Sequence, residues 1–82
     1  MQLIDLAKHS KISVGIKQST KAIATDKAVV LFVANDADQF VVKQVIDLAS
    51  QKSVEIVYIE TMKELGRACN IDVGAATAVI EK

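Results

Sequence analysis

Apolar residues follow two different patterns along this 82-residue chain, a helical spacing and short continuous runs. A spacing of i, i+3, i+4 and i+7, which gathers apolar side chains on one helix face, predicts helices. Short continuous apolar runs predict strands covered on both faces. The helical pattern occupies residues 3–10, 16–25, 39–51 and 62–69, and the strand-like runs occupy residues 12–14, 28–34, 54–59 and 75–80.

The connections between these segments contain residues that favour turns and helix ends. Residues 35–38 read Asn-Asp-Ala-Asp, which predicts a turn with a ready helix cap. Thr61 and Glu64 have the spacing of a capping box at the start of the fourth helix. Asn70 is a suitable end for that helix, since asparagine tolerates the left-handed conformation.

Strands that alternate with helices predict an α/β fold. We expect a three-layer α/β/α sandwich with a small mixed four-stranded sheet, formed by residues 1–82 as a single domain. The order of the strands does not follow from these patterns. The third helix should bury Val42, Val45, Ile46 and Ala49, and the fourth should bury Met62, Leu65, Gly66 and Cys69.

The charge of the chain is balanced in total but not in distribution. Ten basic and ten acidic residues give a formal net charge of zero. Residues 6–25 contain four lysines, Lys8, Lys11, Lys17 and Lys21, and no acid. Such a basic face fits a local contact with a polyanion. Charge alone favours the plainer interpretation, a solvated face without a partner.

Cysteine and histidine usage excludes several kinds of site. A single Cys69 forms neither an internal disulfide nor a cysteine-rich zinc site, and its place on an apolar stripe predicts a core residue. His9 has no neighbouring ligand and is expected to be an ordinary loop residue. The longest apolar run is too short to span a bilayer. We expect a soluble, reduced, cytoplasmic monomer with no cofactor, no metal and no membrane partner.

The segment Gly15-Ile16-Lys17-Gln18-Ser19-Thr20-Lys21 is the strongest candidate site. Gly15 lies where a short strand must turn sharply into a helix. The first turn of a helix presents unpaired N–H groups at the positive end of the peptide dipole, and these suit phosphates or the acceptors on base edges. Lys17, Gln18 and Lys21 project from this turn outside the apolar stripe.

Three other sites were weighed against simpler interpretations. Asp36 and Asp38 have the chemistry for Mg²⁺ or acid–base work, but turn and cap chemistry explains both. Residues 15–21 lack the second glycine of a phosphate loop, which excludes that motif. In the loop Ile71-Asp72-Val73-Gly74-Ala75, the two β-branched residues either tuck into the core or form a small apolar platform for an unstacked base.

These motifs together resemble a known family. Residues 15–21 resemble the Gly-x-Asn-Glu-x-Thr-Lys motif of the kink-turn RNA-binding ribosomal proteins of the L7Ae type. The similarity continues through Val33-Ala34-Asn35-Asp36-Ala37-Asp38 and through Leu65-Gly66-Arg67-Ala68-Cys69 to the loop at residues 71–76. It covers essentially the whole chain, in the same order, and is strongest to short bacterial members that are YbxF-like.

The resemblance implies a non-enzymatic protein that recognises and stabilises kink-turns through their sheared G·A pairs. The partner would be structured RNA containing a kink-turn, in ribosomal RNA or a riboswitch, with the ribosome as a further partner. By position, Lys17 and Gln18 would meet guanine edges, and Lys21 a guanine or a phosphate. The resemblance places the other contacts at Gly15, Ile16, Asp38, Val42, Lys63, Ile71, Val73, Gly74 and Ala75. Asp38 and Val42 would line the pocket of a flipped-out nucleotide, and Lys63 would contact the RNA backbone.

The sequence also departs from the family pattern. Lys17-Gln18 replaces Asn-Glu, Gly74 replaces a proline and Thr25 replaces an arginine. Glutamine offers one acceptor oxygen where glutamate offers two, so we expect a retained preference for kink-turns at lower affinity. The alternative is a ribosome-associated structural or protein-interaction module without kink-turn binding.

Overall fold

The computed structural model describes residues 11–82, which form a four-stranded sheet and three helices. The strands are β1 (Ile12–Val14), β2 (Ala28–Ala34), β3 (Glu55–Ile59) and β4 (Thr77–Glu81). The helices are α1 (Ile16–Ala24), α2 (Gln39–Gln51) and α3 (Met62–Ala68). The helix predicted over residues 3–10 lies outside the described residues.

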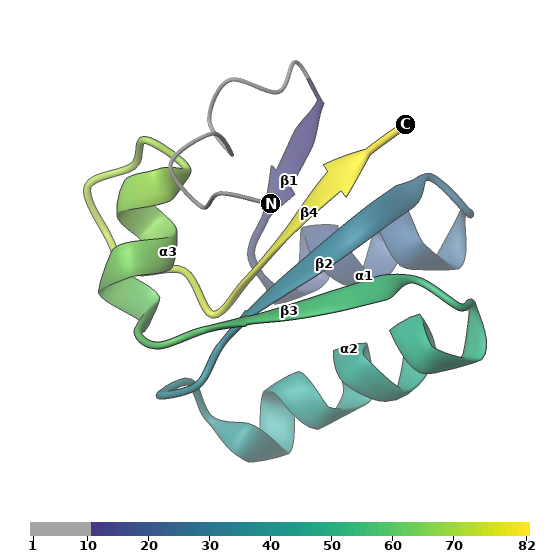
Figure 1. Ribbon diagram of the computed structural model, residues 1–82, viewed down its shortest axis with the longest axis horizontal. Helices are drawn as coiled ribbons and strands as arrows, with labels where there is room; N and C mark the ends of the chain where they lie inside the picture. Colours follow the sequence, from purple (N-terminus) through teal and green to yellow (C-terminus); the bar gives the residue numbers. More distant parts are fainter. Residues whose placement is uncertain (1–10) are drawn as a thin grey trace.

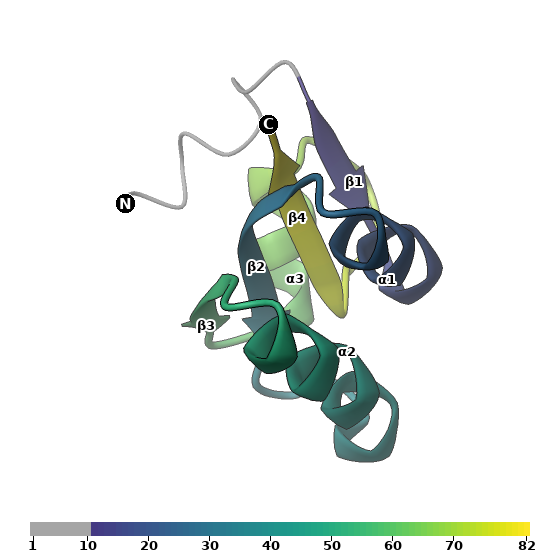
Figure 2. The ribbon, with the colours of Figure 1, turned by 90° about the vertical axis from the view of Figure 1, so that its right-hand side faces the viewer.

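The sheet is mixed, as expected, and its strand order is β1-β4-β2-β3. Strand β2 pairs in parallel with β3 and antiparallel with β4, which also pairs antiparallel with β1. Figures 1 and 2 show three layers, with α1 and α2 on one face of the sheet and α3 on the other. The predicted α/β/α sandwich is therefore confirmed.

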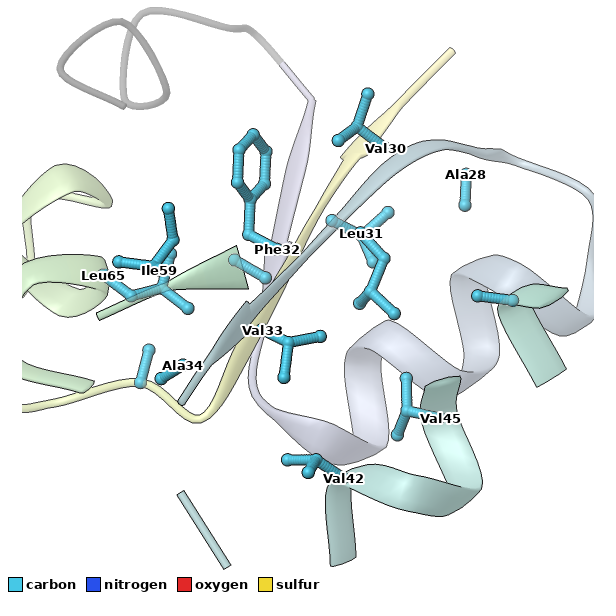
Figure 3. Close-up of a cluster of buried hydrophobic side chains, with 14 of the residues drawn as sticks. Ala28, Val30, Leu31, Phe32, Val33, Ala34, Val42, Val45, Ile59 and Leu65 are labelled. Carbon is cyan, nitrogen blue, oxygen red and sulfur yellow. The ribbon is translucent and has the colours of Figure 1, made fainter. Parts of the chain in front are cut away.

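Strand β2 lies at the centre of the core. Its successive side chains point to opposite faces of the sheet, and both faces are covered. Leu31 and Val33 point toward Val42 and Val45 of α2, while Phe32 points to the opposite face (Figure 3). Every residue of β2 is buried except Val29, which lies where the β2–β4 register shifts and is exposed. The prediction of a continuously buried strand was wrong at that one position.

Several boundaries differ from the sequence prediction: α1 and α3 end one residue earlier, at Ala24 and Ala68, and β4 ends one residue later, at Glu81. Strand β3 begins at Glu55 rather than residue 54, and β4 begins at Thr77 rather than residue 75. Ala75 and Ala76 are instead held by bonds to Met62 and Ala34, outside the β2–β4 residue pairs. In the helices, Ile46 and Met62 are half-buried rather than fully buried.

Candidate nucleic-acid interface

One end of the sheet collects the starts of all three helices. Backbone N–H groups join its strands there: Gly15 donates to Thr77, Ala34 to Ala76 and Asn35 to Ile59, over 2.7–2.9 Å. The start of α1 follows β1 at this end, α2 and α3 follow β2 and β3, and the loop before β4 returns to it. Gly15 at the start of α1 and Ala75 at the end of the loop thus lie at the same end of the sheet, although α1 and α3 pack on its opposite faces.

The start of α1 carries no cap. Gly15 occupies the N-cap position with φ 99° and ψ 163°, a backbone region that is essentially restricted to glycine. No side chain accepts from this turn, and no acidic residue lies in it. Among residues 11–82, the N–H groups of Ile16, Lys17 and Gln18 have no acceptor. These N–H groups form the positive end of the helix dipole, so their partial positive charge adds to that of the nearby lysines.

Buried polar contacts fix this helix against the sheet. The hydroxyls of Ser19 and Thr77, both fully buried, lie 2.9 Å apart and join α1 to β4. Lys17 and Lys21 are four residues apart, so they share a helix face, and both are exposed together with Gln18. Gln18 and Lys21 also border a cavity of about 230 Å³ against the β1 edge. The inner face of α1 is therefore anchored by a buried contact, while its outer face is exposed.

The starts of α2 and α3 are capped. Asp38 accepts from the N–H of Phe40 at 2.9 Å, and Thr61 accepts from that of Glu64 at 3.1 Å. Asp36 accepts from the N–H of Met62 at 2.7 Å, which gives α3 a second cap from a distant turn. The expectation of turn and cap chemistry for Asp36 and Asp38 is confirmed. Within residues 11–82 no group of acidic, cysteine or histidine side chains could hold a metal ion.

The loop at residues 70–74 folds back over α3. Asn70 has φ 62° and ends the helix as predicted. The N–H of Ile71 donates to the carbonyl of Gly66 at 3.1 Å, and that of Ala75 donates to the carbonyl of Met62 at 3.0 Å. Ile71 and Val73 are 37% and 69% exposed. These side chains therefore do not tuck into the core but remain exposed, as the second of the two alternatives requires.

The predicted site residues divide into an exposed group, a half-buried pair and a buried pair. Eight are exposed or lie in an exposed backbone turn: Lys17, Gln18, Lys21, Asp38, Lys63, Ile71, Val73 and Gly74. Gly15 and Ile16 are half-buried at the turn. Val42 has no exposed surface and Ala75 only 3%, because both side chains pack into the core. The expectation that the side chain of Val42 lines a nucleotide pocket therefore does not fit this structure.

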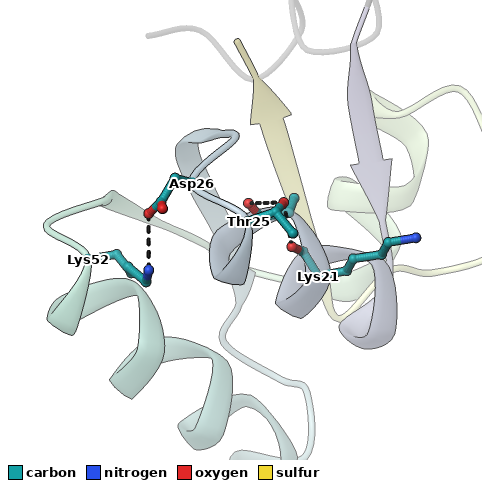
Figure 4. Close-up of polar contacts among 5 residues, drawn as sticks. Lys21, Thr25, Asp26 and Lys52 are labelled. Atoms are coloured by element: carbon teal, nitrogen blue, oxygen red, sulfur yellow. Dashed lines mark hydrogen bonds and ion pairs between the residues drawn. The ribbon is translucent and has the colours of Figure 1, made fainter.

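The predicted basic face is shorter than expected. Lys17 and Lys21 lie at the site, whereas Lys11 precedes β1 and so lies at its other end. Lys8 and His9 are outside the described residues. At the far end of the sheet, Lys52 pairs with Asp26 at 3.1 Å (Figure 4). No helix among residues 11–82 has the length and apolarity needed to cross a bilayer.

Sequence reasoning missed two features of this end. Arg67 is exposed and lies four residues after Lys63, on the same face of α3. That spacing was a usable signal. The bond from Met62 to Asp36 crosses between two turns 26 residues apart, and no local pattern marks it. Cys69 is buried as predicted, and burial raises the pKa of its thiol.

The comparisons with known proteins agree with this geometry. The model of the ribosomal protein L7Ae/L30e/S12e/Gadd45 family matches residues 1–82. The chain belongs to this family. The predicted membership and its resemblance to YbxF-like bacterial members are confirmed.

Several relatives are named for RNA binding. An RNA-binding protein of Caldanaerobacter subterraneus is 52% identical over 65 residues, 79% of each chain. RNA-binding protein YbxF of Geobacillus stearothermophilus is 39% identical over 70 residues, 85% of each chain. The solved structure of the Giardia lamblia 15.5kD RNA binding protein superposes with a TM-score of 0.88 at 31% identity, over 98% of this chain and 68% of that one. These names describe RNA-binding proteins and not enzymes.

Proposed function

We propose that this protein binds RNA, and that it recognises and stabilises kink-turns, with the ribosome as its setting. The observation that carries the proposal is the uncapped start of α1, which lies at the sheet end to which the exposed loop at residues 71–74 returns. RNA-binding relatives and the ribosomal family name support it.

The start of α1 supplies donors for guanine acceptors and phosphates. Lys17 is a flexible point charge that donates to guanine O6 or N7, and the free backbone N–H groups beside it suit a phosphate. Gln18 both donates and accepts, so it pairs with a guanine edge through its single amide oxygen. Gly15 keeps this surface open, because no atom lies within 4 Å of the place that a Cβ would occupy.

The loop supplies an apolar surface for bases that have left the stack. Kink-turns expose unpaired bases beside their sheared pairs, and an exposed apolar patch gives such bases a surface to contact. Val73 and Ile71 offer that surface, and Gly74 packs tightly on Met62, which fixes the position of the loop. Asp38 and Lys63 lie at the starts of α2 and α3. The bent RNA touches both the start of α1 and the loop, whereas an extended duplex touches only one of them, so binding shifts the RNA toward its bent form.

A titration with two RNAs tests the proposal. We expect the wild-type chain to bind a kink-turn more tightly than a continuous duplex of equal length. Gln18→Ala should weaken kink-turn binding by roughly 1–3 kcal/mol and leave duplex binding unchanged, since only base-edge contacts discriminate. Lys63→Ala should weaken both RNAs together and reduce the salt dependence.

The matched control is Lys52→Ala, which removes a lysine at the opposite end of the sheet. If Gln18→Ala lowered the affinities for both RNAs equally, Gln18 would not contact a base edge. Absence of binding by the wild-type chain at micromolar concentration and low salt would favour the ribosome-associated interaction module instead. Co-sedimentation with ribosomal subunits, followed by sequencing of bound RNA, tests the ribosomal setting and identifies the natural target.

A further inference from the structure

A cavity of about 330 Å³ lies between the outer face of α3 and the loop that follows it. Its volume is at the lower end of the range of about 300–1,000 Å³ that ligand pockets occupy, enough for a single small group. The side chains that line it are two cations, two apolar residues and two polar residues: Lys63, Arg67, Ile71, Val73, Asn70 and Asp72.

The backbone builds this cavity through close contact between α3 and the loop. A Cβ on Gly66 would overlap the carbonyl oxygen of Val73, so only glycine lets the loop approach this closely. The bond from the N–H of Ile71 to the carbonyl of Gly66 fixes the near end, and the bond from Ala75 to Met62 fixes the far end. The loop is therefore held beside the exposed face of α3.

The charge inside the cavity is positive by one unit. Lys63 and Arg67 lie one turn apart on that face, and Asp72 is the single acid among the lining residues. In the part of the chain that the structure describes, neither cation lies within ion-pair distance of a carboxylate. One phosphodiester would neutralise this excess.

We propose that Arg67 and Lys63 together bind one phosphodiester of the RNA, while Ile71 and Val73 contact the sugar or base of the same nucleotide. This inference rests on the proposed function and adds the outer face of α3 to the proposed RNA-binding surface. The guanidinium of Arg67 can hold two phosphate oxygens through its planar fork, and Lys63 adds a second positive charge. A phosphate here fixes the strand next to the loop and carries no sequence information.

Equilibrium titration of kink-turn RNA, repeated over a range of salt concentrations, tests this contact. Arg67→Gln should lower affinity about fivefold, the size of a solvent-exposed ion pair, and reduce the salt slope by about 1. Its preference for the kink-turn over duplex should not change. Asp72→Asn should raise affinity, because it removes the one opposing charge. Lys52→Gln, with the same charge change as Arg67→Gln, is the control and should leave the affinity near that of the wild type.

A methylphosphonate scan locates the contact. Replacing single phosphodiesters by the neutral analogue should reveal one linkage whose loss weakens the wild type but not Arg67→Gln. The inference is overturned if Arg67→Gln behaves like Lys52→Gln, or if no linkage couples to Arg67, while kink-turn binding by the wild type still upholds the proposed function. If the wild type binds no kink-turn, both fail.

Discussion

The first turns of α1 and α3 lie at the same end of the sheet and are built in opposite ways. The start of α3 has caps from Thr61 and Asp36 and an acid, Glu64, in its first turn. The start of α1 has glycine at its N-cap, no side-chain cap and no acid. A cap contributes about 0.5–2 kcal/mol, so α1 forgoes stability that α3 has.

This difference separates a structural helix start from a functional one. Caps satisfy the N–H groups of Met62 and Glu64 at the start of α3, and Glu64 opposes its dipole, so less remains there for a ligand. At α1 the same groups stay open beside Lys17 and Gln18. Its stability comes from deeper contacts, such as the buried Ser19–Thr77 bond. The variants below change the contacts, caps and charges that hold α1 and α3, from the largest expected effect on stability to the smallest.

Gly66→Ala should have the largest effect. Alanine is favoured over glycine in a helix by about 1 kcal/mol, but its Cβ would overlap the Val73 carbonyl oxygen. Forcing an extra methyl into a packed contact destabilises by roughly 1–3 kcal/mol and occasionally by more. Because this Cβ would overlap a backbone oxygen, we expect a cost above that range, which outweighs the propensity. We expect a lower free energy of unfolding in urea. Asp47→Ala, at an exposed site of α2, is the control and should not lower it.

Cys69 reports whether the loop has moved in this variant. Burial raises the pKa of its thiol, so little of the reactive thiolate is present at neutral pH. Labelling by a thiol reagent should be slow in the wild type and faster in Gly66→Ala. A stabilised Gly66→Ala with unchanged labelling would show that the loop does not press on Gly66.

Ser19→Ala should destabilise by roughly 1–3 kcal/mol, because it leaves the buried Thr77 hydroxyl without its partner. The double variant Ser19→Ala/Thr77→Val removes both polar groups and should recover part of that loss. A double-mutant cycle in urea measures the coupling. Strictly additive losses would mean that the two hydroxyls do not act as a pair.

Thr61→Ala should destabilise by about 1 kcal/mol, as expected for the loss of an N-cap. Thr61→Ser keeps the acceptor oxygen and serves as the matched control. Thermal unfolding compares the two variants with the wild type. If alanine and serine give the same melting temperature, the cap does not stabilise α3.

Lys17→Glu makes the start of α1 resemble that of α3 and should have the smallest effect. An acid in the first turn stabilises a helix by about 0.3–1 kcal/mol, which for a chain of this size raises Tm by a few degrees. The same change at the C-cap of α2, Lys52→Glu, should lower Tm, because it places negative charge at the negative end of a dipole and removes the pair with Asp26. A fall in Tm for Lys17→Glu would show that the dipole at the start of α1 is already compensated.

The sequence was sufficient where local chemistry decides the structure. Helical spacing predicted α2 from Gln39 to Gln51, and the Thr61–Glu64 pattern predicted the cap of α3. Gly15 and Asn70 marked two of the helix ends that have positive φ, whereas the positive φ of Asp26 after α1 and of Ser53 after α2 was not predicted. Each of the predicted features depends on a few neighbouring residues.

Features that depend on distant contacts could not be predicted in this way. The strand order and the bond from Asp36 to Met62 join segments that only the folded chain brings together. Val42 shows the same limit at the site: its position in the family motif suggested a ligand contact, while its packing under β2 buries it. Arg67 was assigned no role, although its spacing from Lys63 indicates a shared helix face, and the cavity beside it depends on where the following loop folds.

The affinity of Lys17→Glu for kink-turn RNA, compared with that of Lys52→Glu, tests the central claim most directly. Both variants carry the same change of charge at opposite ends of the sheet, and both should remain folded. We predict that Lys17→Glu binds at least about tenfold more weakly than the wild type, whereas Lys52→Glu stays within about threefold. Equal losses in the two variants, or wild-type affinity in Lys17→Glu, would contradict recognition of RNA by the open start of α1.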